Sequence, residues 1–456
     1  MMKTSSAGIL TALLFVALAL RLYRLNDGLW VDEIITWYTY MRLPLAEIPS
    51  AYFSENQHFL FSLAAKCSML LFGESVWAFR LPAALFGVAS IWAMYLFAAE
   101  SASEREGLWS AALLTFSYHH IWYSQTARGY SGLLFWVLLA SWLLVRALRE
   151  ERRSLWIAYA VSAALGVYTH PTMVFLLIVQ AAVACWYMIR RGRYGAVPGF
   201  GLGALLTILL HLPALPAMLQ VPHDTGSSIT AWKQIILTLL REAASGGKLG
   251  LTVLAALPPL ALAGAGLYSF LRNNPVVVVL FAGPPVIGVA TLLMLNHHVY
   301  PRFFFIVFGF GVMIMVRGLL QLKRAATPLM CLFLLASMVL IPRVYGPKQD
   351  FESARHFIDA ERRQGDAVAV TQVTAMVYRN FYSVEWDEVT SNRNLRDLAN
   401  RSERTWFLYT IPEFLRSNQP EMYATIRQKF RKVRAFPGTL NHGDIVVCLY
   451  ERARGE

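Results

Sequence analysis

The sequence predicts an α-helical polytopic membrane protein with about eleven spans and a small C-terminal α/β domain. Hydrophobic residues make up 56% of the 456 residues and charged residues only 15%, whereas soluble domains carry roughly 25% charged residues. Long apolar runs recur as far as Pro342, and beyond it the composition becomes that of a soluble protein. We therefore expect residues 1–342 to form a transmembrane domain and residues 343–456 a soluble one.

Eleven apolar runs approach the length of about 20 residues that a helix needs to cross the hydrocarbon. They are 7–25, 80–99, 107–124, 130–148, 154–169, 172–190, 196–220, 249–271, 275–295, 302–320 and 326–342. A further apolar segment, 58–72, is shorter. If it does not cross, the Arg-rich loops 146–153 and 190–193 lie on the same side as Lys3, which the positive-inside rule makes the cytoplasm. If it crossed, these loops would face outward. We therefore predict that 58–72 dips into the outer leaflet and that the C-terminal domain is extracytoplasmic.

The composition also disfavours several classes of function. The formal net charge is +13, but much of the excess lies in short loops between apolar runs, where basic residues set topology and touch anionic headgroups. Nucleic-acid binding is therefore not indicated. The four cysteines form no CxxC pair, so the sequence predicts neither a zinc site nor a disulfide framework.

The C-terminal segment 343–456 has the pattern of a small α/β domain. Helices are predicted at 350–363 and 420–432, and strands at 366–373, 406–411 and 444–450, from amphipathic and β-rich periodicity. The segment contains no GxGxxG and no P-loop, so nothing predicts nucleotide binding there.

Adjacent carboxylates follow the first span, at the start of the outward loop 26–79. Asp32 and Glu33 lie between Trp30 and Trp37, which suit the membrane–water interface. Neighbouring carboxylates point in different directions, so one can act as a base near an apolar surface while the other pairs with a cation or orients the loop. A solvated pair at the end of a span is the alternative.

The other reactive side chains are cations and imidazoles in the loops predicted to face outward. They are His58, Arg128, His170, His223, His297, His298 and Arg302, with Asp224 beside His223. Arg128 stands on the side that the positive-inside rule leaves poor in arginine, and a guanidinium binds phosphate through two parallel hydrogen bonds. For each histidine taken alone, a structural role is the favoured interpretation. Together with two carboxylates, the set indicates a site for a phosphate-bearing substrate.

These motifs resemble the polytopic glycosyltransferases of the GT-C fold. The similarity is to family 39, which includes the protein O-mannosyltransferases, and to the related lipid A aminoarabinose transferases. It is carried by LRLYRLNDGLWVDEIITW, QHFLFSLAAKCSMLLFGESVWAFRLPAALFGVASIW, HHIWYSQTARGYSGLLFW, VYTHPTMVFLL and YPRFFFIVFGF. The resemblance implies inverting transfer of a sugar from a polyprenyl monophosphate to an acceptor hydroxyl, at the extracytoplasmic face of the plasma membrane. The acceptor stays open between a lipid, a glycan and a protein.

The resemblance also implies roles for individual residues. Asp32 is similar in position to the family's catalytic aspartate, and Glu33 to its acidic neighbour. His58 falls where relatives place His or Lys near the donor phosphate, and Arg302 matches the arginine of the late motif. The expected phosphate ligands are therefore His58, Arg128 and Arg302, together with His297 or His298.

The chain departs from the family pattern at two places. Phe59-Leu60 replace two prolines after His58, and the family's QEAR reads Gln125-Thr126-Ala127-Arg128, which loses a carboxylate. No ligand spacing demands a metal, although a divalent cation stays open because Glu33 and several histidines share one side.

Two other classes of function stay open. One is a transporter or flippase of lipid-linked sugars, which would bury its charges near mid-membrane in paired repeats, and no repeat is seen. The other is an inactive receptor or scaffold.

Overall fold

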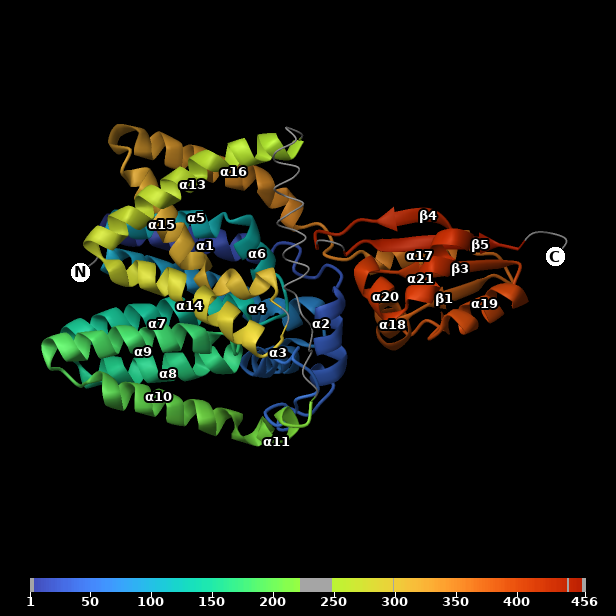
Figure 1. Cartoon of the computed structure of the whole chain (residues 1–456), viewed down its shortest axis with the longest axis horizontal. Helices are drawn as coiled ribbons and strands as arrows, with labels where there is room; N and C mark the ends of the chain where they lie inside the picture. Colours follow the sequence, from blue (N-terminus) through green and yellow to red (C-terminus); the bar gives the residue numbers. More distant parts are fainter. Residues whose placement is uncertain (1–3, 222–247, 298, 441–442, 453–456) are drawn as a thin grey trace. The chain divides into compact units, whose positions relative to one another are not determined.

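The computed structural model describes residues 4–221, 248–297, 299–440 and 443–452, which divide into two compact units (Figure 1). The first unit comprises Met1–Leu25, Pro44–Glu74 and Ala78–Ile341. The second comprises Asn26–Leu43, Ser75–Trp77 and Pro342–Glu456. The first outward loop is thus split, because residues 26–43 fold with the C-terminal segment.

Eight helical segments in the described part of the chain are long and apolar enough to cross a membrane. They are α1 (Thr4–Leu22), α4 (Val76–Ser101), α7 (Tyr130–Glu150), α9 (Met173–Arg191), α10 (Ala196–His211) continued by η2 (Leu212–Ala214) and α11 (Leu215–Met218), α14 (Pro275–Met294), η3 (Pro301–Val307) continued by α15 (Phe308–Leu320), and η4 (Lys323–Ala325) continued by α16 (Ala326–Val344). The polytopic helical membrane class is confirmed.

The three other predicted spans are also helical. Two of them are α8 (Arg153–Thr169) and α13 (Lys248–Asn273). The third, predicted as one helix over 107–124, is two helices: α5 (Glu104–Thr115) and α6 (Tyr118–Ser124). The break has a local cause, because the Ser117 side chain accepts a hydrogen bond from the His120 N–H and so caps a new helix.

The segment 58–72 forms the helix α3 (Phe59–Phe72), which ends at Gly73. Its 14 residues would extend only about 21 Å, less than the hydrocarbon thickness of about 30 Å. Helix α7 lies at the centre of the first unit, where Leu134 and Leu138 are fully buried and where it packs on α8 and α9 (Figure 1).

The second unit contains a five-stranded sheet of order β2-β1-β3-β5-β4. Its strands are β1 (Ala367–Val370), β2 (Asp387–Glu388), β3 (Arg404–Tyr409), β4 (Arg431–Phe436) and β5 (Ile445–Glu451). β1 pairs in parallel with β2 and β3, and β5 pairs antiparallel with β3 and β4. The small C-terminal α/β fold is therefore confirmed.

The remaining elements of the second unit are helical. They are α2 (Val31–Thr36), η1 (Trp37–Met41), α17 (Phe351–Glu361), α18 (Gln372–Ala375), η5 (Met376–Phe381), α19 (Asn392–Arg401), α20 (Pro412–Asn418) and α21 (Pro420–Lys429). The predicted helices correspond to α17 and α21, and the three predicted strands to β1, β3 and β5. Two predicted ends are wrong: the helix 420–432 stops at Lys429 because β4 begins at Arg431, and the strand 366–373 stops at Val370 because α18 begins at Gln372. The sequence did not indicate β2, which has two residues, or β4, whose exposed face is charged.

Candidate functional site

Four side chains from distant parts of the first unit form what we call the cationic cluster: His58, Arg128, His170 and Arg302. His58 precedes α3, and Arg128 lies between α6 and α7. His170 ends α8, and Arg302 lies in η3. The rings of His58 and His170 are 4.9 Å apart, and both arginines act electrostatically on both imidazoles. The structure thus brings together three of the predicted phosphate ligands and adds His170.

The imidazole of His58 has a defined tautomer. Its Nδ1 lies 3.2 Å from the carbonyl oxygen of Thr169, and because a carbonyl only accepts, Nδ1 must donate. Nε2 is therefore left as an acceptor, buried and without a hydrogen-bond partner among the described residues. A buried polar atom of this kind needs an explanation, and a hydroxyl of a bound substrate would supply the missing donor.

Gly129 allows the backbone to come this close to His58. A Cβ atom at Gly129 would lie 2.6 Å from the Thr169 carbonyl oxygen and 3.0 Å from Nδ1 of His58. Any side chain there would therefore displace the carbonyl, the imidazole or both. The position of His58 therefore requires a glycine at position 129, just before Tyr130 in the ARGY segment.

His170 has the opposite hydrogen-bond polarity. Its Nδ1 accepts from the backbone N–H of Thr172 at 3.3 Å and lies 2.9 Å from the Thr172 hydroxyl. A neutral His170 therefore carries its proton on Nε2 and can donate. The pair offers one acceptor nitrogen and one donor nitrogen.

The imidazoles of His58 and His170 are both neutral at pH 7. Burial lowers the pKa of His170 to about 3, helped by the positive charges of Arg128 and Arg302. Burial, Arg128 and His170 hold the pKa of His58 well below its usual range, although the hydrogen bond to Thr169 opposes them. The positive charge of the cluster therefore belongs to the two arginines.

The arginines are held by neighbouring groups. Nη1 of Arg128 donates to the backbone oxygen of Asn56 at 2.9 Å and also to its side-chain oxygen. The guanidinium of Arg302 lies over the ring of Tyr300, 4.5 Å from the centroid, a cation–π contact. Arg128 is 3% exposed, so an anion beside it would be shielded from water and bound more strongly than at the surface.

Aromatic rings line one side of the cluster. The Tyr130 ring lies 5.1 Å from His170 and 5.7 Å from His58. Tyr123 is 5.0 Å from Tyr130 and 4.3 Å from Phe305. These rings limit the space around the imidazoles and offer faces on which a sugar could stack.

The predicted carboxylates lie in the second unit. The Glu33 carboxylate is fully buried and accepts a hydrogen bond from the Trp30 N–H at 3.3 Å, so it caps α2. Asp32 is partly exposed, and its backbone oxygen accepts from the Thr36 hydroxyl. The two neighbours are therefore not equivalent, because only Asp32 is partly exposed.

The two remaining predicted ligands follow α14. The backbone N–H of His297 donates to the carbonyl of Leu292 at 2.8 Å, and its side chain is partly buried. His298 lies outside the described residues, as do His223 and Asp224. We do not include His297 in the cationic cluster, because the charges that act on His58 and His170 come from Arg128 and Arg302.

Part of the chain matches the model of a known protein family. Residues 56–216 match the family model of the dolichyl-phosphate-mannose-protein mannosyltransferases, a stretch of about a third of the chain that includes His58, Arg128 and His170. No curated protein sequence matches the chain.

Solved structures match nearly end to end. ArnT from Cupriavidus metallidurans bound to undecaprenyl phosphate is similar with a TM-score of 0.54 and 11% identity, over 97% of this chain and 98% of ArnT. Apo ArnT from the same organism gives 0.51 and 12%, over 98% of each chain. The oligosaccharyltransferase AglB from Archaeoglobus fulgidus, in complex with an inhibitory peptide and a dolichol-phosphate, gives 0.52 and 12%, over 90% of this chain and 70% of AglB. The protein has the GT-C fold. At these identities the likeness establishes the fold.

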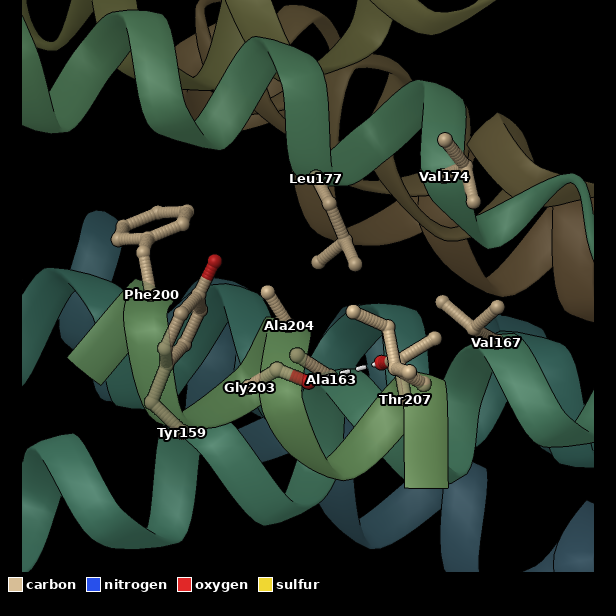
Figure 2. Close-up of a pocket in the computed structure, with 10 residues that line it drawn as sticks. Tyr159, Ala163, Val167, Val174, Leu177, Phe200, Gly203, Ala204 and Thr207 are labelled. Atoms are coloured by element: carbon tan, nitrogen blue, oxygen red, sulfur yellow. Dashed lines mark hydrogen bonds between the residues drawn. The ribbon is translucent and has the colours of Figure 1, made fainter. Parts of the chain in front are cut away.

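Within this GT-C fold, an apolar cavity of about 290 Å³ lies between α8, α9 and α10. Figure 2 shows Leu177 of α9 pointing into it above Ala204 of α10. Val167 and Val174, which also line it, flank the turn that carries His170. Along α8 the lining runs from Tyr159 to Val167, about 12 Å at 1.5 Å per residue. A slot of this kind suits an apolar chain.

Sequence reasoning placed His170 among the reactive outward residues but not among the expected phosphate ligands, and it did not select Tyr123 or Tyr130. The signal was present for His170, because it stands in the YTH segment on the outward side, but a single histidine before proline is as often structural. No group of three or more His, Cys, Asp or Glu able to hold a metal occurs among the described residues.

The pKa values predict how stability depends on pH. An unfolded histidine binds a proton below about pH 6.5, whereas folded His170 does so only near pH 3. Between these values the unfolded state binds more protons, so we expect stability to fall as pH falls below about 6.5. Thermal denaturation in detergent at pH 7.5 and at pH 5 measures this loss of stability. We expect the loss to be smaller in His170→Gln than in the wild type. The control is His356→Gln, whose side chain is exposed; an equal fall in both variants would contradict the assignment.

Proposed function

We propose that this GT-C protein is a membrane glycosyltransferase that moves a sugar from a polyprenyl-phosphate donor to an acceptor hydroxyl. The observation that carries the proposal is the cationic cluster, in which two arginines and two neutral imidazoles from four separate segments converge. The solved GT-C relatives bound to undecaprenyl phosphate and dolichol-phosphate support a lipid-phosphate donor.

Each group in the cluster has a chemical role in this reaction. Attack by the acceptor oxygen on the anomeric carbon breaks the bond to the phosphate oxygen, which leaves with the electron pair. Arg128 and Arg302 stabilise the charge that develops on the phosphate, and preorganised cations of this kind are often the largest catalytic contribution. Nε2 of His170 donates to a phosphate oxygen, and Nε2 of His58 accepts from a hydroxyl of the donor.

The acceptor must lose a proton as the new bond forms. Asp32 is proposed as the general base that takes it, because it matches the family's aspartate and is accessible on α2. Glu33 holds α2 in shape through its hydrogen bond to Trp30. One displacement without a covalent intermediate gives inversion at the anomeric carbon.

We propose the extracytoplasmic face of the plasma membrane for this reaction. The support is the distribution of arginine, which is dense in the 146–153 and 190–193 loops that the positive-inside rule assigns to the cytoplasm. The acceptor is a hydroxyl of a lipid, a glycan or a protein side chain.

The direct test is transfer in proteoliposomes. Purified protein should move a radiolabelled or fluorescent sugar from a polyprenyl monophosphate to a hydroxyl acceptor and release polyprenyl phosphate. A panel of lipid, glycan and peptide acceptors identifies the acceptor class. Movement of the intact donor across the bilayer without any transfer would instead show a flippase.

The apolar slot predicts a dependence on the donor's chain. If it holds the polyprenyl chain, Ala204→Phe should raise KM for a long-chain donor about tenfold, because the lost contact of a few methylenes costs about 1.4 kcal/mol. A donor with only two isoprene units should be unaffected. Leu205→Phe is the control, because Leu205 is exposed and does not line the cavity. Equal KM values for Ala204→Phe and wild type would assign the slot to ordinary membrane lipid.

A further inference from the structure

One glutamine joins the first outward loop to the C-terminal segment inside the second unit. Gln349 lies just before α17 and is 3% exposed. Its Oε1 accepts a hydrogen bond from the Val31 N–H at 3.0 Å. Its Nε2 donates to the hydroxyl of Thr410 at 3.2 Å. A single buried side chain therefore connects the first residue of α2 with the first residue after β3.

The hydrogen bonds of Gln349 continue through Thr410 into the sheet. The Thr410 hydroxyl donates to the carbonyl of Gly443 at 3.3 Å, shortly before β5, and β3 and β5 are adjacent strands. Gly443 has no side chain at a point where a Cβ would lie 3.1 Å from Cγ of Gln349. The glutamine is thus held between two strand ends, and because it is buried, water is poorly placed to replace it.

Helix α2 depends on such a contact because it has only six residues. The N–H groups of a first turn have no acceptor within the helix, and helices this short are not stable alone. The Trp30 N–H is satisfied by Glu33 of the same helix, whereas the Val31 N–H is satisfied by Gln349.

The other end of this segment is held by an aromatic contact. The Trp37 ring, which begins η1, meets Phe381 of η5 edge to face at 6.3 Å. Gln349 therefore fixes the start of α2, and Phe381 fixes its continuation.

We propose that Gln349 is a positioning residue for Asp32, through which the C-terminal sheet sets the orientation of the proposed base. Asp32 follows Val31 directly, so a rotation of α2 about its first residue moves the carboxylate. The inference rests on the proposed function of Asp32. It makes the C-terminal domain a part of the catalytic machinery, because the sheet fixes the atoms that hold α2.

The test compares two substitutions at one site. Gln349→Leu removes both hydrogen bonds at similar volume, and we expect kcat to fall about 10- to 100-fold, since small misplacements of a reacting group have effects of this order. Donor KM should stay within about twofold. Gln349→Glu keeps an oxygen for the Val31 N–H and should recover kcat to within about threefold of wild type. Wild-type kcat in Gln349→Leu, or equal losses in both variants, would overturn the proposal.

A second measurement does not depend on activity. Hydrogen exchange of the segment 29–36 should be faster in Gln349→Leu and protected in Gln349→Glu, with β3 and β5 protected in both. Unchanged exchange in Gln349→Leu would show that the bridge does not hold α2.

The Asp32→Asn background separates this inference from the proposed function. If Gln349 acts through Asp32, Asp32→Asn combined with Gln349→Leu should be no slower than Asp32→Asn alone. A further loss in the double variant would show an independent role and overturn the positioning proposal. Absence of transfer by the wild type would instead refute the proposed function, and the exchange data would still decide whether Gln349 holds α2.

Discussion

Asp32→Asn should reduce turnover by about 10²- to 10⁴-fold, the range that a positioned general base contributes. Asparagine has nearly the same shape as aspartate but cannot take the proton of the acceptor hydroxyl. Expression and donor binding should stay near wild type, because Asp32 is partly exposed and is not assigned to the phosphate. The measurement is transfer from a labelled polyprenyl-phosphate sugar in proteoliposomes.

Glu33→Gln is the matched comparison for this variant. Its carboxylate is fully buried and accepts from the Trp30 N–H, and a glutamine oxygen can accept the same hydrogen bond. We therefore expect a loss of less than about tenfold. A solvated carboxylate pair would leave both variants near wild type, and full activity in Asp32→Asn would refute the mechanism while the GT-C fold stands.

The membrane architecture was predictable because a fixed hydrocarbon thickness imposes a minimum length on every apolar run. The break between α5 and α6 was not, because the apolar run 107–124 is continuous and one serine cap ends the first helix. The short strand β2 and the charged edge strand β4 were also missed, since each is defined by its pairing in the sheet and has no clear period of its own.

The candidate site was predictable in its residue types but not in its hydrogen bonding. Arg128 was selected because it lies on the side that is otherwise poor in arginine, and His58 and Arg302 because they resemble the family's residues in position. The tautomers of the imidazoles depend on Thr169 and Thr172, and the contact with Thr169 comes from a helix more than a hundred residues along the chain. The spacing of residues along the sequence does not predict such a contact.

The YSQTAR segment shows how one motif serves two purposes. Nε2 of Gln125 donates to the carbonyl oxygens of Arg21 and Tyr23, at 3.2 and 2.6 Å, and so secures the end of α1. Three residues later Arg128 enters the cationic cluster. The motif therefore links the packing of the first helix to the position of a proposed phosphate ligand.

Arg302 is the arginine of the cationic cluster for which the chain offers a matched control. It acts on both imidazoles of the cluster and stacks on Tyr300 through η3. Its counterpart for comparison is Arg272, in the last turn of α13, whose guanidinium lies 5.1 Å from the Tyr268 ring. The two arginines make the same kind of cation–π contact, but only Arg302 belongs to the cluster.

Arg302→Ala should weaken donor binding by about 1.5 to 3 kcal/mol, the usual contribution of a hydrogen bond to a charged group, which corresponds to roughly 10- to 150-fold in Kd. His58→Ala should also weaken the donor more than the acceptor. Arg272→Ala loses an equivalent aromatic contact and should leave the donor Kd unchanged. Binding of a fluorescent polyprenyl-phosphate sugar to detergent-solubilised protein measures all three. An unchanged Kd in Arg302→Ala would place the phosphate elsewhere, and an unchanged Kd in His58→Ala would refute its hydrogen bond to a hydroxyl of the donor.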